Sequence, residues 1–328
     1  MHNRIILSAV AATCLLVGCG NASENNGSQK KVESFQALPF PEVVPPMMIQ
    51  GSQQAAEYMV LHWWDGITDT SRTYPCDTSL VSGVRLGDVE QKMANWTDLF
   101  GKVDLQVVGK AMARLYERAA ACEKRDTSSN VFETFEELVD KYLYDPNSPL
   151  RNEDYYSLYA EHLAVSDLVE PVIQEKYARI VRLAALNRIG TKAADFRFMD
   201  KSGAMHTLYG IKAELTLLFF SNPGCTACKY IIDVLNNVPV ISGLIDNGTM
   251  KVLNIYIDED LEAWRSYMPI YPETWYNGFD PDLVIRGETL YNVRAIPSLY
   301  LLDRDKKVIM KDAPEERLFE WLSSFGER

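Results

Sequence analysis

The residues with the clearest chemical potential are Cys225 and Cys228, which are separated by two residues in the segment Cys-Thr-Ala-Cys. They follow an apolar run at 215–220 and open an apolar stretch at 230–235 whose pattern is typical of a helix. Unpaired backbone N–H groups at a helix N-terminus favour a thiolate, so we expect a lowered pKa for Cys225. Cys228 lies one helical turn further on, close enough to form a disulfide. The segment therefore predicts a redox-active dithiol.

A zinc site and a buried, inert pair of thiols are the two alternatives. A structural zinc ion needs four ligands, usually completed by a second Cys/His pair at similar spacing. No Cys or His follows Cys228, and His206 stands alone upstream. We therefore prefer the redox interpretation and expect neither a metal nor another cofactor.

A second candidate element is Ile296-Pro297, which directly precedes the apolar run 298–302. Proline cannot donate to a β-ladder, so Pro297 predicts the start of a strand. Together with the Cys-x-x-Cys segment, this pattern resembles the thioredoxin-like family, in which the corresponding strand begins with a cis-proline packed against the Cys-x-x-Cys loop. Only a small minority of X–Pro bonds are cis, so the sequence leaves the isomer open. The resemblance implies that Ile296 and Pro297 position an extended substrate segment.

Within that family, the chain is similar to the TlpA/ResA-like thiol-disulfide lipoproteins. The segment Gly190–Phe196, with a turn at 200–203, matches their entry into the first core strand. The resemblance covers residues 189–328. It implies an α/β thioredoxin-like fold, with a central mixed sheet flanked by helices, C-terminal to an all-α domain.

Three positions depart from the family pattern. Gly224 stands where a tryptophan usually precedes the first cysteine, and we expect it to border the substrate. Phe219 and Ile231 stand where relatives carry an aspartate and a glutamate. The group that deprotonates Cys228 is thus left open between water, Lys229 and a carboxylate between Asp258 and Glu288.

The N-terminus has the pattern of a bacterial export signal. A basic head containing Arg4 precedes an apolar run at 5–17, which is too short for a stable membrane-spanning helix. The sequence Leu-Val-Gly-Cys at 16–19 resembles a lipobox, so Cys19 is the predicted lipid attachment site. An ordinary signal peptide with an incidental cysteine is the alternative. We expect a lipid-anchored protein of the bacterial cell envelope, with the outer membrane favoured because Gly20 follows Cys19.

These signals divide the chain into four parts. Residues 1–18 are the predicted lipoprotein signal peptide, and residues 19–46 are a polar, then proline-rich, tether. Residues 47–188 form a helical domain, and residues 189–328 form the thioredoxin-like domain. The helical part resembles an uncharacterised domain that precedes a thioredoxin-like module in some anaerobe lipoproteins.

The helical domain carries no nucleophile–base constellation and no phosphate loop. Apolar positions at helical spacing predict helices at 52–64, 103–124, 131–143, 155–163 and 169–189. Its aromatic residues invite a ligand-stacking interpretation, but core packing is preferred because aromatic side chains dominate helix interfaces. The residues in question are Trp63, Trp64, Tyr155, Tyr156 and Tyr159.

Two further cysteines, Cys76 and Cys122, remain after the signal peptide, the lipid site and the dithiol are assigned. In an oxidising compartment they are a candidate structural disulfide. The alternative is that Cys122 is a small buried apolar residue and Cys76 a loop thiol.

The segment 261–289 is unusually aromatic for a connection between strands. One interpretation is a small core of its own beneath a long loop. The other is a lip over Cys225 that selects the substrate.

The leading hypothesis is a membrane-anchored thiol-disulfide oxidoreductase in which Cys225 attacks a substrate disulfide and Cys228 resolves the mixed disulfide. The expected partners are cysteine-containing envelope proteins and a redox donor or acceptor protein. The alternative is a non-catalytic or redox-sensing scaffold whose helical domain binds a partner. A formal net charge of −12 argues against a nucleic-acid partner.

Overall fold

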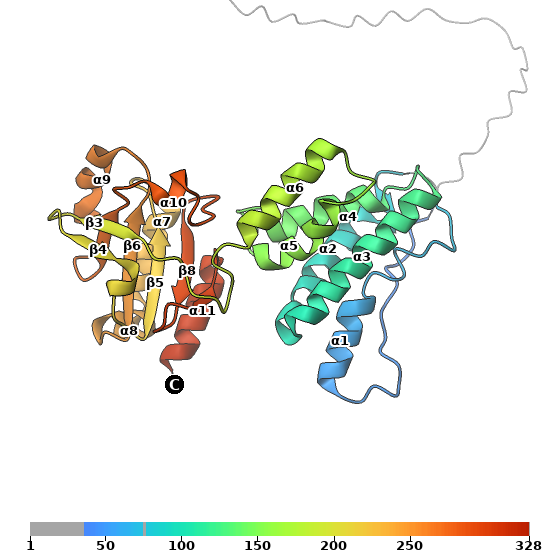
Figure 1. The fold of residues 1–328 in the computed structure, drawn as a ribbon. Helices are drawn as coiled ribbons and strands as arrows, with labels where there is room; N and C mark the ends of the chain where they lie inside the picture. The colour runs from blue at the N-terminus through green and yellow to red at the C-terminus, as the bar shows by residue number, and fades with distance from the viewer. Residues whose placement is uncertain (1–35, 75–76, 328) are drawn as a thin grey trace, which may run out of the picture. The chain divides into compact units, whose positions relative to one another are not determined.

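The computed structural model describes residues 36–74 and 77–327. The predictions for the signal peptide and for Cys19 lie outside the described residues, as does Cys76. Residues 37–328 form one compact unit, in which a helical region (α1–α6) is followed by a mixed β-sheet with flanking helices (Figure 1). The fold class expected from the sequence is therefore confirmed.

Six α-helices make up most of the helical region. They are α1 (Ser52–His62), α2 (Leu86–Thr97), α3 (Leu105–Arg125), α4 (Val131–Val139), α5 (Glu153–Leu163) and α6 (Pro171–Ala184). A two-stranded hairpin, β1 (Leu80–Val81) and β2 (Val84–Arg85), precedes α2, and a π-helical segment, η2 (Asp140–Tyr144), extends α4. Helix α2 was not expected from the sequence.

Aromatic side chains form the centre of the helical region. Trp64, Tyr156 and Tyr159 are buried. The ring of Trp64 packs edge-on against Trp96 and Phe135. The preference for core packing over ligand stacking is thus confirmed for the buried aromatics.

Among the described residues, seven strands form the sheet of the C-terminal region. They are β3 (Arg197–Asp200), β4 (Met205–Thr207), β5 (Leu215–Phe220), β6 (Met250–Tyr256), β7 (Tyr276–Phe279), β8 (Ser298–Leu302) and β9 (Val308–Met310). Their order is β4-β3-β7-β6-β5-β8-β9. The pairs β5–β6 and β6–β7 are parallel, and every other pair in this sheet is antiparallel.

Strand β5 is buried on both faces, which explains its uninterrupted apolar sequence. Because side chains alternate along a strand, Leu217 and Phe219 face one core and Leu218 and Phe220 the other. The first core is covered by helices α7 (Thr226–Asn237), α8 (Pro239–Asp246) and α11 (Glu315–Gly326). The other core is covered in part by the short helix α10 (Val284–Gly287).

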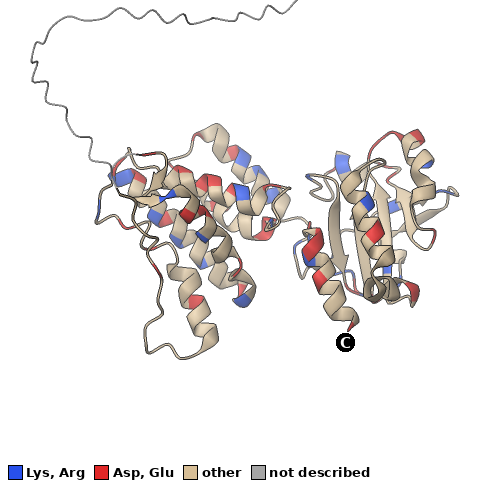
Figure 2. Cartoon of the chain, turned by 180° about the vertical axis from the view of Figure 1, so that it is seen from behind, with Lys and Arg blue, Asp and Glu red and all other residues tan. Residues whose placement is uncertain are grey.

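Charged residues avoid this sheet interior. Strands β5 and β8 contain no charged residue. Acidic and basic residues are instead interspersed along the helices, as Figure 2 shows. The acidic net charge is therefore distributed over a mixed surface.

The aromatic segment 261–289 was interpreted either as a small separate core or as a lip over Cys225. In the structure it also supplies a strand to the central sheet, which neither interpretation includes. After α9 (Leu261–Tyr267), Tyr276–Phe279 forms β7 between β3 and β6. Trp264, Tyr271 and Trp275 are buried in the same core as Cys228. The idea of a separate core beneath a loop is therefore wrong, since these side chains fill the main core.

No single described helix is long and apolar enough to cross a membrane, although the bent pair α7–α8 reaches the required length and composition together.

Candidate active site

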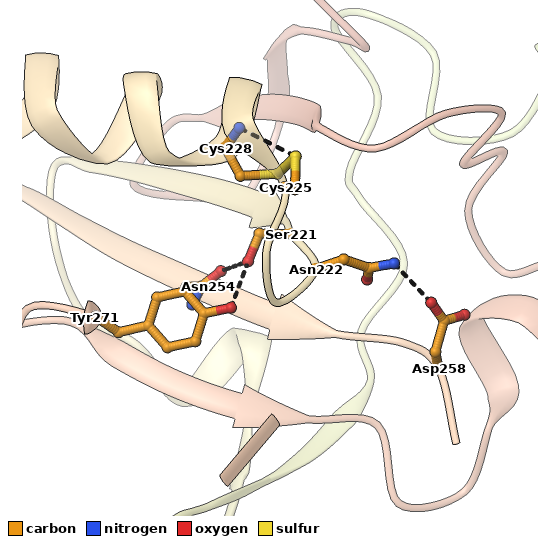
Figure 3. Close-up of a disulfide and its surroundings, with 7 residues drawn as sticks. All are labelled: Ser221, Asn222, Cys225, Cys228, Asn254, Asp258 and Tyr271. Atoms are coloured by element: carbon orange, nitrogen blue, oxygen red, sulfur yellow. Dashed lines mark hydrogen bonds between the residues drawn. A yellow bond between two sulfur atoms is a disulfide. The ribbon is translucent and has the colours of Figure 1, made fainter. Parts of the chain in front are cut away.

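The two predicted redox cysteines form a disulfide at the start of α7, with their Cα atoms 5.2 Å apart. Cys225 is the N-cap residue, and its sulfur accepts a hydrogen bond from the backbone N–H of Cys228 at 3.1 Å (Figure 3). Cys225 is half-buried, whereas Cys228 is only 2% exposed. An attacking substrate therefore meets Cys225 first.

The loop between β5 and α7 delivers Cys225 to this position. The side-chain amide of Asn222 donates to Asp258 at 2.7 Å, and Arg286 forms an ion pair with the same carboxylate. Gly224 has a left-handed φ of 74°, which a residue with a Cβ adopts at a cost. It is exposed, and apart from its chain neighbours no residue lies within 4 Å of a Cβ built at this position. The surface beside Cys225 is therefore open where relatives place tryptophan.

Sheet register brings Ile296-Pro297 to the disulfide. Phe220, the last residue of β5, pairs with Ser298, the first residue of β8, so Pro297 lies beside the start of the cysteine loop. The Ile296–Pro297 peptide bond is cis. Ile296 and Cys225 both pack against the core that contains Cys228. The structure thus places Ile296 and Pro297 beside the loop that carries Gly224, Cys225 and Cys228, while their roles with a substrate stay predictions.

A buried polar network lies on the same face of the sheet as Cys228, below it in Figure 3. Ser221 follows β5 and donates its hydroxyl proton to the carboxamide oxygen of Asn254. The hydroxyl of Tyr271 lies 3.3 Å from the Ser221 oxygen, and Asn254 donates to Asn277 at 3.0 Å. Burial raises the pKa of Tyr271. The network is therefore neutral at physiological pH.

This network occupies the sheet face where the family pattern expects an acid. Phe219 and Asn254 are direct partners across β5 and β6, and both side chains lie on the α7 side. Of the proton acceptors left open by the sequence, Lys229 forms an ion pair with Asp233, and Asp258 holds Asn222. Both groups thus already have a partner, and Asp258 supports the cysteine loop through Asn222.

Sequence patterns missed Ser221, Asn254 and Tyr271 as parts of the site. Asn254 interrupts the apolar run of β6, and a polar residue at a buried position of a strand is the one signal that could have drawn attention to it. Tyr271, the second partner of Ser221, lies 50 positions from it in the chain, so no local pattern joins them.

The other predicted residues lie away from this site. Cys122 is buried in α3. Because Cys76 lies outside the described residues, the candidate disulfide between them stays a prediction. Among the residues that the structure describes, no group of three or more His, Cys, Asp or Glu side chains could hold a metal ion.

Comparisons with known proteins find relatives of both the helical and the C-terminal region. A family model described as a domain of unknown function (DUF5106) matches residues 18–187. A thioredoxin-like protein from Bacteroides caccae is 36% identical, over 86% of this chain and 97% of its own, with a TM-score of 0.73.

Two structures from Bacteroides fragilis match the C-terminal part alone. One, the C-terminal domain of an uncharacterised protein, is 46% identical over 42% of this chain and 98% of its own, with a TM-score of 0.41. The other, a conserved protein of unknown function, is 37% identical over 41% of this chain and 98% of its own, with a TM-score of 0.40. No curated protein matches the chain.

The family model covers more than half of the 328 residues, and the Bacteroides caccae protein aligns over nearly its whole length. Both regions of the chain are thus accounted for, together with the Cys-x-x-Cys disulfide at the start of α7. The chain belongs to the DUF5106 family through residues 18–187 and, over most of its length, to the family of the thioredoxin-like protein from Bacteroides caccae.

Proposed function

We propose that this protein is a thiol-disulfide oxidoreductase that acts through Cys225 and Cys228. The observation that carries the proposal is the hydrogen bond from the Cys228 backbone N–H to the sulfur of Cys225 at the N-terminus of α7. In the reduced protein, the same N–H and the helix dipole favour a thiolate at Cys225. Its buried partner is held in reach to complete the exchange.

The proposed reaction is a two-electron exchange of thiols and disulfides. The Cys225 thiolate attacks one sulfur of a substrate disulfide, forming a mixed disulfide and releasing one substrate thiolate. The Cys228 thiolate then attacks the Cys225 sulfur, which releases the second substrate thiolate and forms the protein disulfide. Two electrons pass from the protein to the substrate, and the two released thiolates take up protons. The same steps in reverse oxidise a substrate dithiol.

The surface around Cys225 suits a protein substrate. Gly224, Thr226 and Ala227 are all exposed, so the surface around Cys225 is accessible to another protein. Ile296 and Pro297 border the same position and offer backbone to an extended segment. We infer that the substrates are cysteine-containing proteins of the cell envelope, served by a separate redox donor or acceptor protein.

We also propose that the protein is a lipoprotein of the TlpA/ResA-like kind, attached to the bacterial envelope through Cys19, with the outer membrane favoured. The sequence Leu-Val-Gly-Cys at 16–19 supports this. Expression of the full chain and of Cys19→Ser in a diderm bacterium tests it. Wild type is expected in the membrane fraction and the variant in the soluble periplasmic fraction; equal distribution of both would exclude the lipid anchor.

The decisive experiment for the function is a redox titration of the soluble chain in glutathione and dithiothreitol buffers, with mass-tagging of free thiols. A potential near about −270 mV would indicate a reductase, and one near about −120 mV an enzyme that introduces disulfides. In parallel, Cys228→Ser should trap a mixed disulfide with substrates through Cys225, and the double variant with Cys225→Ser should trap none. If Cys225 and Cys228 form no reversible disulfide and Cys228→Ser traps nothing, the chain is a scaffold.

A further inference from the structure

A cluster of buried charges lies outside the dithiol site and plays no part in the exchange reaction. Glu153, Lys311 and Asp312 are 2%, 7% and 6% exposed. Burying an ion is costly unless it is paired and hydrogen-bonded, so such a cluster calls for a structural reason. Glu153 is the first residue of α5 in the helical region, whereas Lys311 and Asp312 follow β9 in the thioredoxin-like region.

Glu153 of the helical region contacts Lys311 and the segment of the C-terminal region that precedes Pro297. One of its carboxylate oxygens lies 2.9 Å from the Lys311 ammonium. The other accepts a hydrogen bond from the side chain of Asn292 at 2.7 Å and lies 4.0 Å from the Arg294 guanidinium. Asn292 and Arg294 lie five and three residues before Pro297.

Arg294 is held by the helical region through a second residue, Tyr144. The guanidinium lies over the Tyr144 ring, 4.3 Å from its centroid, and donates to the Tyr144 carbonyl oxygen. On its other side Arg294 forms an ion pair with Asp312 at 3.0 Å. The Arg294 side chain is only 10% exposed, so its stacking and charge contacts are made out of water, where they are strongest.

Asp312 completes the arrangement on the far side of the proline. Its second carboxylate oxygen accepts the hydroxyl hydrogen bond of Ser298 at 2.8 Å. Ser298 directly follows Pro297. The segment from Asn292 to Ser298 is therefore fixed at both ends, and the anchor before the proline comes from Glu153 and Tyr144.

We propose that Arg294 is a positioning residue for substrate binding, held by Glu153 and Tyr144 of the helical region. The helical region thereby sets the place of Ile296 and Pro297 relative to Cys225. This inference rests on the proposed function, since it assumes that the substrate lies along this segment. It gives the DUF5106 domain a direct part in the thioredoxin-like chemistry.

The test compares two disulfide substrates of different size, using a soluble form that begins after Cys19 and has been reduced beforehand. A disulfide-linked peptide needs the Ile296-Pro297 segment, whereas a small aromatic disulfide, dithiobisnitrobenzoate, needs only the Cys225 sulfur. Arg294→Met keeps an unbranched apolar stem, removes the guanidinium group and leaves Glu153 with Lys311. It should lower the rate constant for the peptide about tenfold relative to that for the small disulfide.

Arg197→Met is the matched control, because Arg197 forms an exposed ion pair with Asp282 in the same region and does not contact the segment. Both rate constants should stay within about twofold of wild type for this variant. Tyr144→Leu serves as a milder second variant that keeps every ion pair, and it should shift the ratio in the same direction as Arg294→Met. An unchanged ratio in folded Arg294→Met and Tyr144→Leu would overturn the positioning role while the proposed function stands.

Amide hydrogen exchange of the same proteins distinguishes the failure of this inference from that of the function. The peptide containing residues 292–300 should exchange faster in Arg294→Met than in wild type, while β5 should not change. If wild type reduces neither substrate, the proposed function fails. Unchanged amide exchange at 292–300 in Arg294→Met would separately show that Arg294 does not fix the position of this segment.

Discussion

The sulfur of Cys225 lies 3.1 Å from the backbone nitrogen of Cys228 and accepts its hydrogen bond, while Cys228 itself is buried. In the reduced protein the two thiols should therefore differ sharply in reactivity. We expect iodoacetamide at neutral pH to modify Cys225 at least about tenfold faster than Cys228, because thiolate character and exposure both favour Cys225. Mass spectrometry of the singly modified protein measures this ratio. Equal rates would show that the helix terminus does not activate Cys225.

Gly224 should resist substitution because of its backbone conformation alone. Its φ is 74°, and a Cβ at this position would meet no other residue within 4 Å. We expect Gly224→Ala to lower the free energy of unfolding by about 1 kcal/mol through backbone strain. Urea titration of the oxidised protein measures the loss.

The control for that substitution is Gly287→Ala. Gly287 also has open space around a built Cβ, but its φ is not in the left-handed region. This variant should match wild type or exceed it slightly, since alanine is the better helix residue. Similar losses in both variants would argue against strain at Gly224.

The neutral network beneath Cys228 should stabilise the folded protein, because its buried polar groups hydrogen-bond to one another. Asn254→Ala leaves the Ser221 hydroxyl and the Asn277 carboxamide oxygen without their shared partner. We expect a loss of about 2 to 3 kcal/mol in the free energy of unfolding. Tyr271→Phe should cost less, within about 1 kcal/mol, because Ser221 keeps its bond to Asn254. A larger loss for Tyr271→Phe than for Asn254→Ala in chemical denaturation would contradict this ranking.

Asp200, at the end of β3, should make the free energy of unfolding depend on pH in the acidic range. Hydrogen bonds from Ser202 above all, then from His206 and the Ala204 backbone, hold the pKa of Asp200 well below its usual value against slight desolvation. A carboxyl with a lowered folded-state pKa contributes stability above its unfolded-state pKa and loses it as the pH falls. With solvent screening, Asp200→Asn should cost about 1 kcal/mol at pH 7.

The difference between wild type and Asp200→Asn should shrink as the pH falls below about 4, the unfolded-state pKa of aspartate. Urea titrations at pH 7, 5, 4 and 3 follow it. Asp246→Asn, at an exposed position at the end of α8, is the control and should differ little from wild type at any of these pH values. A difference that grows toward low pH would refute the assignment.

Counting free thiols tests the predicted disulfide between Cys76 and Cys122. Together with Tyr74, two residues before Cys76, it lines one small cavity. In a soluble form that begins after Cys19, we expect no free thiol before reduction and four after it. Cys122→Ala should then cost about 2 to 4 kcal/mol by opening the disulfide loop. Two free thiols in the denatured, unreduced protein would instead show that Cys76 and Cys122 are not bonded.

Elements with continuous apolar runs were predictable from the sequence. β5 (Leu215–Phe220) and β8 (Ser298–Leu302) coincide with the apolar runs identified in the sequence, and α7 contains the helix-like stretch at 230–235. The two strands are buried along their whole length and α7 buries one apolar face, so burial and local pattern agree. The Cys-x-x-Cys segment and Pro297 were identified for the same reason, since their chemistry is encoded in adjacent residues.

Strand β7 was not predictable, because its sequence Tyr-Asn-Gly-Phe carries two residues that disfavour strands. The glycine is required by its neighbours: a Cβ on Gly278 would lie 2.9 Å from the Met199 carbonyl oxygen and 2.6 Å from the Phe198 ring. Likewise, Glu153 and Asn292 are 139 positions apart. Contacts of this kind arise only when the sheet and the helices are assembled, and no local pattern announces them.

The sheet presents very little backbone to other molecules. In the part of the chain that the structure describes, its two outermost strands, β4 and β9, are three residues long. The outer side of β9 is itself covered, since Gly190 and Thr191 exchange backbone hydrogen bonds with Val308. Unpaired strand edges are templates for edge-to-edge association between copies of a protein. Under the proposed function, an extended segment of a substrate protein would therefore meet Pro297 but almost no unpaired strand edge on which it could aggregate.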